Sequence, residues 1–391
     1  MKYNFDEVHD RIGSNSVKWD ERPDVIPMWV ADMDFKAAPF IIDAVRRRVD
    51  HGIFGYTHVP ESYYDSVIRW FRERRGWTID RSWIQYISGI VPALSVAVQA
   101  LTEQGDKVLI HAPAYNCFYS SVRNIGRELV ESRLVRKGDS FEVDFADFEN
   151  KCADPDVKLF ILCNPQNPAG RVWAREELVR MGDICLKHGV TVVSDEIHCE
   201  LEMPGHTYTP FASISKEFEM NSVIFNSPTK SFNIAGLEIA NIIAADKEKY
   251  DRIERVINIF EHCDVNPLGV EALQAAYTEE GAEWLRQLNA YLASNYNTLK
   301  IMLDDMPQVK VCRLEGTYLV WVDCSWFTSR GTSTKRIQDS LLENEKVWIN
   351  SGTMYGDGDY MRINIACPHI TLVEGLSRAK AGLKRIVSEM S

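Results

Sequence analysis

The sequence has no uncharged apolar run that approaches the roughly 18 residues of a membrane span. Its first residues, M-K-Y-N-F-D-E-V-H-D, lack the apolar stretch that a secretory signal needs. Positive charge is also in deficit, because 44 Lys and Arg stand against 56 Asp and Glu, a formal net charge of −12. Sequence-independent binding of nucleic acids and of anionic membranes requires a basic surface, so we expect neither as a partner.

Paired cysteines are missing as well. The nine cysteines, Cys263 among them, are odd in number and scattered, and no C-x-x-C pair occurs. This spacing is typical neither of a disulfide framework nor of a zinc site. We therefore expect buried, reduced thiols in a cytoplasmic protein, and no metal.

The chain also lacks internal repeats, low-complexity tracts and long Gly/Ser/Pro linkers, so its organisation must be read from hydrophobic patterning. Amphipathic spacing predicts helices over 39–51, 62–74, 91–101, 116–123 and 174–188, and apolar runs predict strands over 83–89, 107–111, 157–164, 190–194, 221–226 and 240–245. Several of these strands are continuous β-branched runs, as expected where both faces of a sheet are covered. The alternation predicts an α/β domain with a mostly parallel sheet between helices.

The C-terminal part has a different pattern. A long helix is predicted over 279–305, followed by strands over 309–313, 317–324, 346–350 and 360–366 mixed with two helices. This order is typical of a smaller α+β domain. We divide the chain into an N-terminal arm with part of the small domain (1–45), a large domain (46–280) and a C-terminal small domain (281–391).

Ligands of open α/β sheets bind outside the carboxyl ends of the strands, so the loops there are the candidate sites. In S-G-I-V-P (88–92) the free N–H groups of Ile90 and Val91 would suit a phosphate at a helix N-terminus, although a plain connection fits equally. In N-P-Q-N-P (164–168) Asn167 could offer an amide to a ligand or cap its own turn.

Two further loops carry charged groups. V-V-S-D-E-I-H (192–198) places Asp195 at a strand end, where it either faces a cation or caps an exposed helix, and His198 follows, which by itself is more often structural. N-S-P-T-K-S-F-N (226–233) holds Lys230 without a charged neighbour. That lysine is either a solvated loop residue or a desolvated, nucleophilic amine.

One cofactor needs all four loops. Pyridoxal phosphate requires a lysine for its Schiff base, an anion against its pyridinium nitrogen, a donor to its phenolate oxygen and N–H groups around its phosphate. An aromatic face against the ring is usual, and P-A-Y (113–115) offers Tyr115, which could equally be a half-buried loop residue.

The sequence resembles the fold-type I pyridoxal phosphate enzymes of the aspartate aminotransferase family. The motifs that carry this resemblance are spread over residues 88–364 and are S-G-I-V, P-A-Y, N-P-A-G, S-D-E-x-H, S-P-T-K-S-F and Y-M-R-I-N. A finer resemblance is to the C–S lyase subgroup of this family, the MalY/PatB-type cystathionine β-lyases. It rests on the motifs D-R-x-G-S-N-S-V-K-W-D (10–20), W-V-A-D-M-D-F (29–35), F-G-Y (54–56), D-E-I-H (195–198) and S-F-N-I-A-G-L (231–237). Ordinary aminotransferases of this fold carry tyrosine where His198 stands and a phosphate-binding arginine where Glu238 stands.

The resemblance implies a role for each candidate. Lys230 would form the Schiff base and act as the catalytic base, and Arg362 would grip the substrate carboxylate beside Ala31. The cofactor would be held by Asp195 at its ring nitrogen, Asn167 at its phenolate oxygen, Tyr115 stacked on its ring, and His198, Ile90, Val91 and Ser227. Tyr56 resembles the tyrosine that reaches the phosphate, and assists catalysis, from a neighbouring subunit, which implies a homodimer. Without the resemblance, Arg362 would be taken for an edge-strand residue in a surface ion pair.

The expected activity is β-elimination from cystathionine, cysteine or S-substituted cysteines, giving a thiol, pyruvate and ammonia. Two alternatives remain at this point. An aminotransferase would use the same residues and differ only after the Cα proton is removed. A protein whose main role is binding a partner, such as a regulator, could retain the same fold.

Overall fold

The computed structural model describes residues 3–261 and 264–390. An eight-stranded sheet has the order β2-β9-β8-β7-β6-β3-β4-β5. Its strands are β2 (Ile84–Ile87), β3 (Lys107–Ala112), β4 (Glu128–Lys137), β5 (Ser140–Val143), β6 (Val157–Cys163), β7 (Thr191–Asp195), β8 (Ser222–Asn226) and β9 (Ala240–Ile243). The pairs β4–β3, β3–β6, β6–β7 and β7–β8 are parallel, whereas β9 and β5 are antiparallel to their neighbours. The expected mostly parallel, mixed sheet is confirmed.

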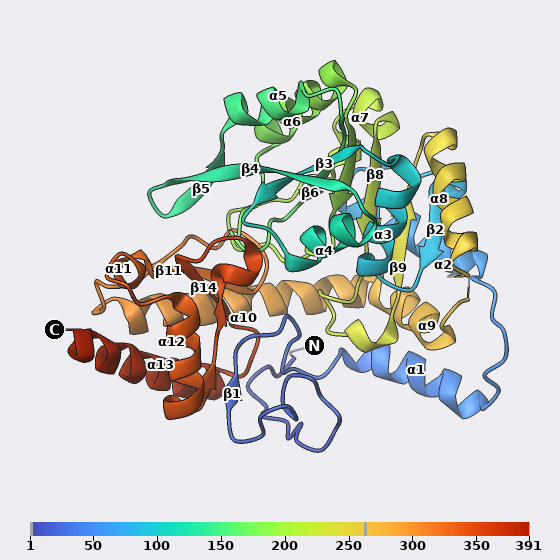
Figure 1. The fold of residues 1–391 in the computed structure, drawn as a ribbon. Coiled ribbons are helices and arrows are strands. Elements are labelled where there is room, and N and C mark those ends of the chain that lie inside the picture. The colour runs from blue at the N-terminus through green and yellow to red at the C-terminus, as the bar shows by residue number, and fades with distance from the viewer. Residues whose placement is uncertain (1–2, 262–263, 391) are drawn as a thin grey trace.

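Helices cover both faces of this sheet (Figure 1). They are α2 (Glu61–Arg75), α3 (Ile90–Leu101), α4 (Asn116–Asn124), α5 (Phe145–Cys152), α6 (Arg175–His188), α7 (Lys216–Met220), α8 (Lys247–Ile259) and α9 (Pro267–Ala276). The helix α1 (Pro39–His51) packs against α9. Side chains alternate across the sheet, so that Leu159 and Ile161 pack in the core under α3, while Phe160 and Leu162 pack in the opposite core. This two-sided burial explains the continuous apolar runs in the strands.

A second, smaller sheet lies in the C-terminal part. Its antiparallel order is β10-β11-β14-β13, with β10 (Lys310–Val311), β11 (Leu319–Asp323), β13 (Asn350–Ser351) and β14 (Tyr360–Asn364). The helices here are α10 (Glu279–Leu303), α11 (Ser325–Thr328), α12 (Thr334–Ser340) and α13 (His369–Met390). Figure 1 shows α10 running beneath the main sheet and into this smaller part, which agrees with the expected α+β unit.

Some local predictions differ from the structure. The expected strand over 346–350 is two short strands, β12 (Val347–Trp348) and β13, which belong to different sheets. β12 pairs in parallel with β1 (Ile26–Pro27) of the N-terminal arm, whereas β13 pairs with β14. The hairpin β4–β5 and the helices α5, α8 and α9 were not predicted. Neither strand of β4–β5 is a fully buried run, so its hydrophobic pattern is a weak signal.

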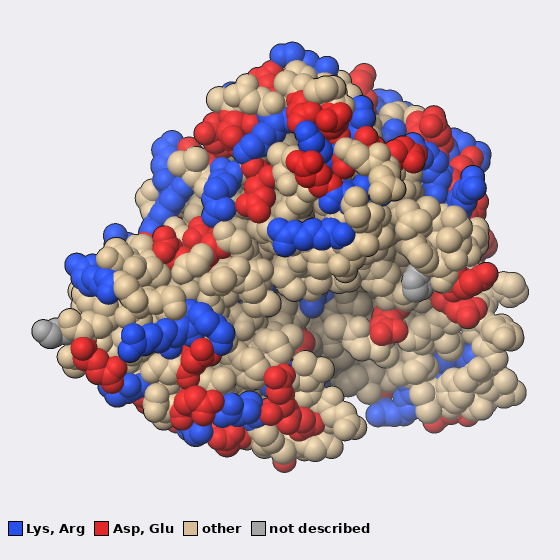
Figure 2. Space-filling view, in the orientation of Figure 1, with Lys and Arg blue, Asp and Glu red and all other residues tan. Residues whose placement is uncertain are grey.

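Charge and cysteine can now be placed on the fold. Figure 2 shows acidic and basic side chains interspersed over the face it presents. The described cysteines are free thiols, and Cys263 lies outside the described residues. Within the described ranges, no helix is long and apolar enough to cross a membrane, and no group of three or more His, Cys, Asp or Glu side chains could hold a metal ion.

Candidate active site

A cavity of about 300 Å³ opens at the carboxyl ends of the main-sheet strands. Its walls are built by the loops that follow β2, β3, β6, β7 and β8, together with one residue of the N-terminal arm. The predicted site residues that line it are Ala31, Ile90, Val91, Tyr115, Asn167, Asp195, His198 and Lys230. The loops meet there because neighbouring parallel strands end at the same edge of a sheet.

Lys230 lies in the turn after β8. Its Nζ donates a hydrogen bond to the carbonyl oxygen of Ala31 at 2.7 Å. Burial lowers the pKa of this amine, and the positive charge of Arg362 adds to that effect, although Asp32 and Asp195 oppose it. The lysine is therefore not a solvated loop residue, and a larger share of its amine is unprotonated than in water.

Asp195 is the last residue of β7 and is buried. One of its oxygens accepts from the backbone N–H of Ile197 at 3.2 Å. Burial raises the pKa of this carboxyl group to about 7, against the opposing effects of that N–H and of Lys230. This burial excludes the alternative that Asp195 caps an exposed helix. A buried carboxylate in this position favours a cationic partner in the cavity.

Asn167 lies in the loop after β6, and its amide orientation is set by a buried neighbour. Nη1 of Arg362 donates to Oδ1 of Asn167 at 3.1 Å. A guanidinium group can only donate, so the amide must turn its oxygen toward Arg362. The Nδ2 donor then has no acceptor within residues 3–261 and 264–390. This geometry presents an N–H group to a ligand in the cavity.

Arg362 lies on β14, which is flanked by β11 and β13, so it is not on an edge strand. Its side chain is buried, with Nη2 donating to the carbonyl oxygen of Trp29 at 3.0 Å and the guanidinium stacked 4.4 Å from the centroid of Tyr355. Its Nε has no hydrogen-bond partner in the described part of the chain. Arg362 does not line the cavity itself but lies directly behind Asn167. A surface ion pair is excluded by this burial.

The helix α3 begins at the cavity. Its N-cap is Gly89, which has no side chain to cap the free N–H groups. Ile90 and Val91 therefore present unpaired N–H groups, while Pro92 has none to present. Glu238 lines the same cavity in a left-handed backbone conformation, with φ at 48°. A bare helix N-terminus is a good environment for an anion.

Ser227 is buried just behind the cavity wall. Its hydroxyl donates to the carbonyl oxygen of Ile239 at 2.6 Å and lies 2.7 Å from the hydroxyl of Thr229. The only hydroxyl proton of Ser227 is used by Ile239, so in this arrangement Thr229, which does line the cavity, has the better access to a ligand. A phosphate contact of Ser227 stays a prediction.

His198 and Tyr115 occupy other walls of the cavity. His198 is buried, its Nδ1 has no hydrogen-bond partner among the described residues, and its ring packs edge-on against Tyr318. Burial, with the charges of Lys230 and Arg362, lowers the pKa of His198 to about 3, so the ring is neutral. Burial raises the pKa of Tyr115, which keeps its hydroxyl protonated. A structural histidine would have hydrogen-bond partners for its ring nitrogens, and His198 lacks one at Nδ1 among the described residues.

Tyr56 is fully exposed, with a relative accessibility of 101%, on the segment between α1 and α2. It does not line the cavity of its own chain. Glu200 also lies outside the cavity. Its buried carboxylate accepts from the Trp70 indole and from Arg74, so it fastens α2 to the loop after β7.

Several residues at the site were not predicted. Asp32 follows Ala31 in the arm segment and acts on Lys230, and the side chains of Asn233, Tyr318 and Asn364 bind the backbone of that segment. Asp32 and Asn233 belong to the motifs W-V-A-D-M-D-F and S-F-N-I-A-G-L, so the sequence did contain a signal that these two residues lie near the site. Tyr318 and Asn364 reach the segment only through the small sheet, and the sequence offered no direct sign of them.

The fold and this cavity define an enzyme of the aspartate aminotransferase type. The chain belongs to the aminotransferase class I and II family, whose profile matches residues 23–378.

Among individual proteins, the chain is 43% identical to cystathionine beta-lyase PatB of Bacillus subtilis over 97% of this chain and 100% of that protein. It is 31% identical to protein MalY of Escherichia coli over 96% of this chain and 97% of that protein. The crystal structure of cystalysin from Treponema denticola, which contains a pyridoxal 5'-phosphate cofactor, superimposes with a TM-score of 0.94 at 33% identity, covering 99% and 100% of the two chains.

Proposed function

We propose that the protein is a pyridoxal phosphate-dependent C–S β-lyase of the cystathionine β-lyase type. It would cleave L-cystathionine, L-cysteine or S-substituted cysteines to a thiol, pyruvate and ammonia. The observation that carries this proposal is one cavity that holds the amine of Lys230, the carboxyl group of Asp195 and the amide of Asn167, with Arg362 behind it. The identity to PatB along the full chain supports the lyase over other reactions of the family.

The polar groups of the cavity fit the cofactor. Burial raises the pKa of Asp195 although Lys230 opposes that effect, and a pyridinium N–H would supply a cation directly against the carboxylate. The Nδ2 of Asn167 would donate to the phenolate oxygen, and the N–H groups of Ile90 and Val91 would receive the phosphate. Tyr115 supplies an aromatic face on the cavity wall. Lys230 supplies the amine for a covalent link.

When bound, pyridoxal phosphate supplies an electron-withdrawing ring that makes the Cα proton of an attached amino acid acidic. The chain's own residues would do the rest. Arg362 would bind the α-carboxylate of the substrate through its remaining N–H groups, a contact that suits guanidinium geometry. Lys230, as a free amine, would take the Cα proton, a role that its lowered pKa supports.

The electron pair of the broken Cα–H bond would form a Cα–Cβ double bond, and the Cβ–S bond would break with its electrons on sulfur. The thiolate is a good leaving group and takes up a proton after it departs. The three-carbon product would react with water to give pyruvate and ammonia. Asp195, held ionised by a cation, would keep the charge distribution that favours proton removal.

Quaternary structure and cellular location are part of the same proposal. Tyr56 is fully exposed, and Ile53 and Phe54 beside it are 66% and 59% exposed, which supports burial of this segment against a second copy. In that homodimer Tyr56 would reach the partner's phosphate. The free thiols support a cytoplasmic location.

We also propose the division into 1–45, 46–280 and 281–391. The positions of the two sheets, one within 84–243 and the other within 310–364, support it. The first boundary falls inside α1, so the arm would join the large domain through that helix.

The test uses purified protein, pyridoxal phosphate and cystathionine without any keto-acid acceptor. Sustained release of thiol and pyruvate over many turnovers is expected. If amino-group transfer to an added keto acid is the only turnover, the protein is an aminotransferase and the lyase proposal is wrong.

A further inference from the structure

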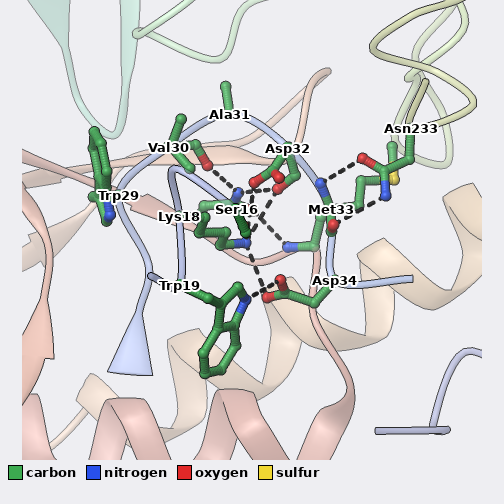
Figure 3. A network of polar contacts seen from close by, with 12 residues as sticks. Ser16, Lys18, Trp19, Trp29, Val30, Ala31, Asp32, Met33, Asp34 and Asn233 are labelled. Atoms are coloured by element: carbon green, nitrogen blue, oxygen red, sulfur yellow. Dashed lines mark hydrogen bonds and ion pairs between the residues drawn. The ribbon is translucent and has the colours of Figure 1, made fainter. Parts of the chain in front are cut away.

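The segment 29–35 has no regular secondary structure, although it carries the carbonyl group that holds Lys230. Side chains from distant elements bind its backbone in place of a neighbouring strand (Figure 3). Its carbonyl oxygens accept from Arg362 and Asn350 at Trp29, from Asn364 at Val30 and Asp32, from Tyr318 at Ala31, and from Asn233 at Met33 and Phe35. Together these hydrogen bonds fix the backbone at Ala31 and on both sides of it.

Lys18 is the buried centre of this arrangement. Its side chain is 1% exposed and its Nζ lies 2.9 Å from Oδ2 of Asp34. The same Nζ donates to the carbonyl oxygen of Asp32 at 3.2 Å, one residue from Ala31. The other oxygen of Asp34 accepts from Trp19 Nε1 and from Arg11 Nη1, each at 2.8 Å. Figure 3 shows Lys18 and Trp19 converging on Asp34 beneath the 29–35 segment.

The loop of Lys230 is tied to the other end of the segment. Asn233, three residues after Lys230, accepts from the N–H of Met33 at 2.9 Å and donates to the Met33 carbonyl at 2.9 Å. The segment is therefore held between Lys18 on one side and the lysine's own loop on the other. Displacement of residues 29–35 would move the acceptor away from the Lys230 amine.

The charged groups around the 29–35 segment also balance one another. Arg11 lies 2.8 Å from Asp32, and Lys18 lies 3.6 Å from its second oxygen, so two cations offset the two carboxylates Asp32 and Asp34. The charge of Asp32 raises the pKa of Lys230, against the larger effect of burial. The other groups that face Lys230 are Arg362, Asp195, Cys117, the hydroxyl of Tyr318 and the neutral ring of His198.

We propose that Lys18 and Asp34 are positioning residues for Lys230: they fix the 29–35 segment so that the Ala31 carbonyl holds the amine at the cavity, and they keep that region electrically neutral. The expected effect of these two residues on turnover rests on the proposed function. It assigns a task to D-R-x-G-S-N-S-V-K-W-D, a motif that supplies no group to the cavity.

The experiment compares Lys18→Met, Asp34→Asn and the control Arg22→Met. Arg22 belongs to the same arm and pairs with Glu343 at 3.0 Å, but it does not contact the 29–35 segment. Each holoenzyme is titrated by the absorbance of the lysine–cofactor link and assayed for kcat and KM across pH. Each cofactor-free protein is labelled with acetic anhydride across pH, and modification of Lys230 is measured by mass spectrometry.

Lys18→Met removes a positive charge, so the Lys230 labelling curve should move to higher pH, by roughly half a unit to one unit. Asp34→Asn removes a negative charge, so the curve should move to lower pH. Both should lower kcat about tenfold or more with little change in KM, because a small misplacement of a reacting group is costly. Arg22→Met should match the wild-type protein.

Shifts in opposite directions cannot arise from general destabilisation, which would move both variants alike. Unchanged labelling curves and kcat in Lys18→Met and Asp34→Asn would overturn the proposal, as would equal shifts in Arg22→Met. If Lys18→Met does not fold, Asp34→Asn decides, since asparagine keeps the shape of the side chain. If the wild-type protein binds the cofactor but releases no pyruvate, the proposed function fails, while the labelling curves still test the positioning role.

Discussion

Nη1 of Arg362 donates to Oδ1 of Asn167 at 3.1 Å, which joins two buried residues 195 positions apart in the chain. One comes from the loop after β6 in the main sheet and the other from β14 in the small sheet. The contact fixes the amide of Asn167 with its N–H group toward the cavity. It also couples the group expected to bind the substrate carboxylate to one expected to bind the cofactor ring. Replacement of Arg362 should therefore disturb both.

Arg362→Lys should lower kcat/KM by about a hundredfold, mainly through a higher KM, because an ammonium group cannot make two parallel hydrogen bonds to a carboxylate. Steady-state rates with cystathionine measure this change, and the absorbance spectrum of the bound cofactor should also shift as Asn167 loses its partner. Arg330→Lys is the control, since Arg330 is an exposed arginine of the same part of the chain. An unchanged KM would show that Arg362 does not bind the carboxylate.

Lys230→Ala should abolish the visible absorbance of the lysine–cofactor link and lower turnover by at least about a thousandfold, since both the nucleophile and the base are lost. Spectra and pyruvate release are the measurements. Lys216→Ala, which removes an exposed lysine paired with Glu219, should behave as wild type. A Lys230→Ala protein that keeps both spectrum and turnover would refute the assignment.

Asp195 and Glu196 are adjacent buried carboxyl groups that point to different surroundings. Glu196 accepts from Ser194 and from the N–H of Phe211, away from the cavity, while Asp195 lines the cavity. Asp195→Asn should lower kcat by about a hundredfold or more and leave the fold intact, because a neutral amide cannot stabilise a pyridinium charge. Glu196→Gln should instead lower the free energy of unfolding by about 1–3 kcal/mol, with kcat largely retained.

Comparison of kcat and urea unfolding for the two variants checks this pair. Equal losses of kcat in both would contradict the separate roles.

The pH dependence of stability follows from the raised pKa of Asp195. In the cofactor-free protein the folded-state pKa is about 7, above the ordinary carboxyl value, so the folded state holds a proton that the unfolded state releases. This stabilising contribution is full below the ordinary carboxyl pKa and is lost as pH rises toward 7. Asp195→Asn cannot titrate, so its stability relative to wild type should increase between pH 4 and 7, by up to about 1.4 kcal/mol per pH unit.

Urea unfolding of both cofactor-free proteins at several pH values measures the difference and cancels other titrating groups such as His198. A difference independent of pH would show that Asp195 is ionised in the empty cavity.

Tyr56 offers a test of the proposed dimer. Tyr56→Ala and Lys230→Ala should each be impaired, but mixing them under conditions that exchange subunits should restore about a quarter of the wild-type sites, because half of the dimers are mixed and each has one intact site. Pyruvate release before and after exchange measures the gain. No gain on confirmed subunit exchange would mean that Tyr56 does not act across the interface.

Most of the main sheet and the order of its loops were predictable because six of its eight strands are local runs of apolar residues. The pair β4–β5 was not, since neither strand is a continuous buried run. The split of 346–350 into β12 and β13 was not either, since β12 pairs with β1, which lies far away in the chain. Asp195, Asn167 and Lys230 could be predicted as a set because strand ends in a parallel sheet share one edge. Ser227 could be placed near the site, but the use of its hydroxyl proton by Ile239 could not.

By itself the sequence determined which chemical groups stand at the strand ends, because periodicity and turn residues are local properties of the chain. Only the tertiary structure decided how those groups are held. It showed that Arg362 is buried on an inner strand and that the carbonyl of Ala31, in a segment without regular structure, binds the Lys230 amine. It also placed Lys18 against Asp34 of that segment. These contacts join residues far apart in sequence, and burial, which sets the pKa of each group, exists only once the chain has folded.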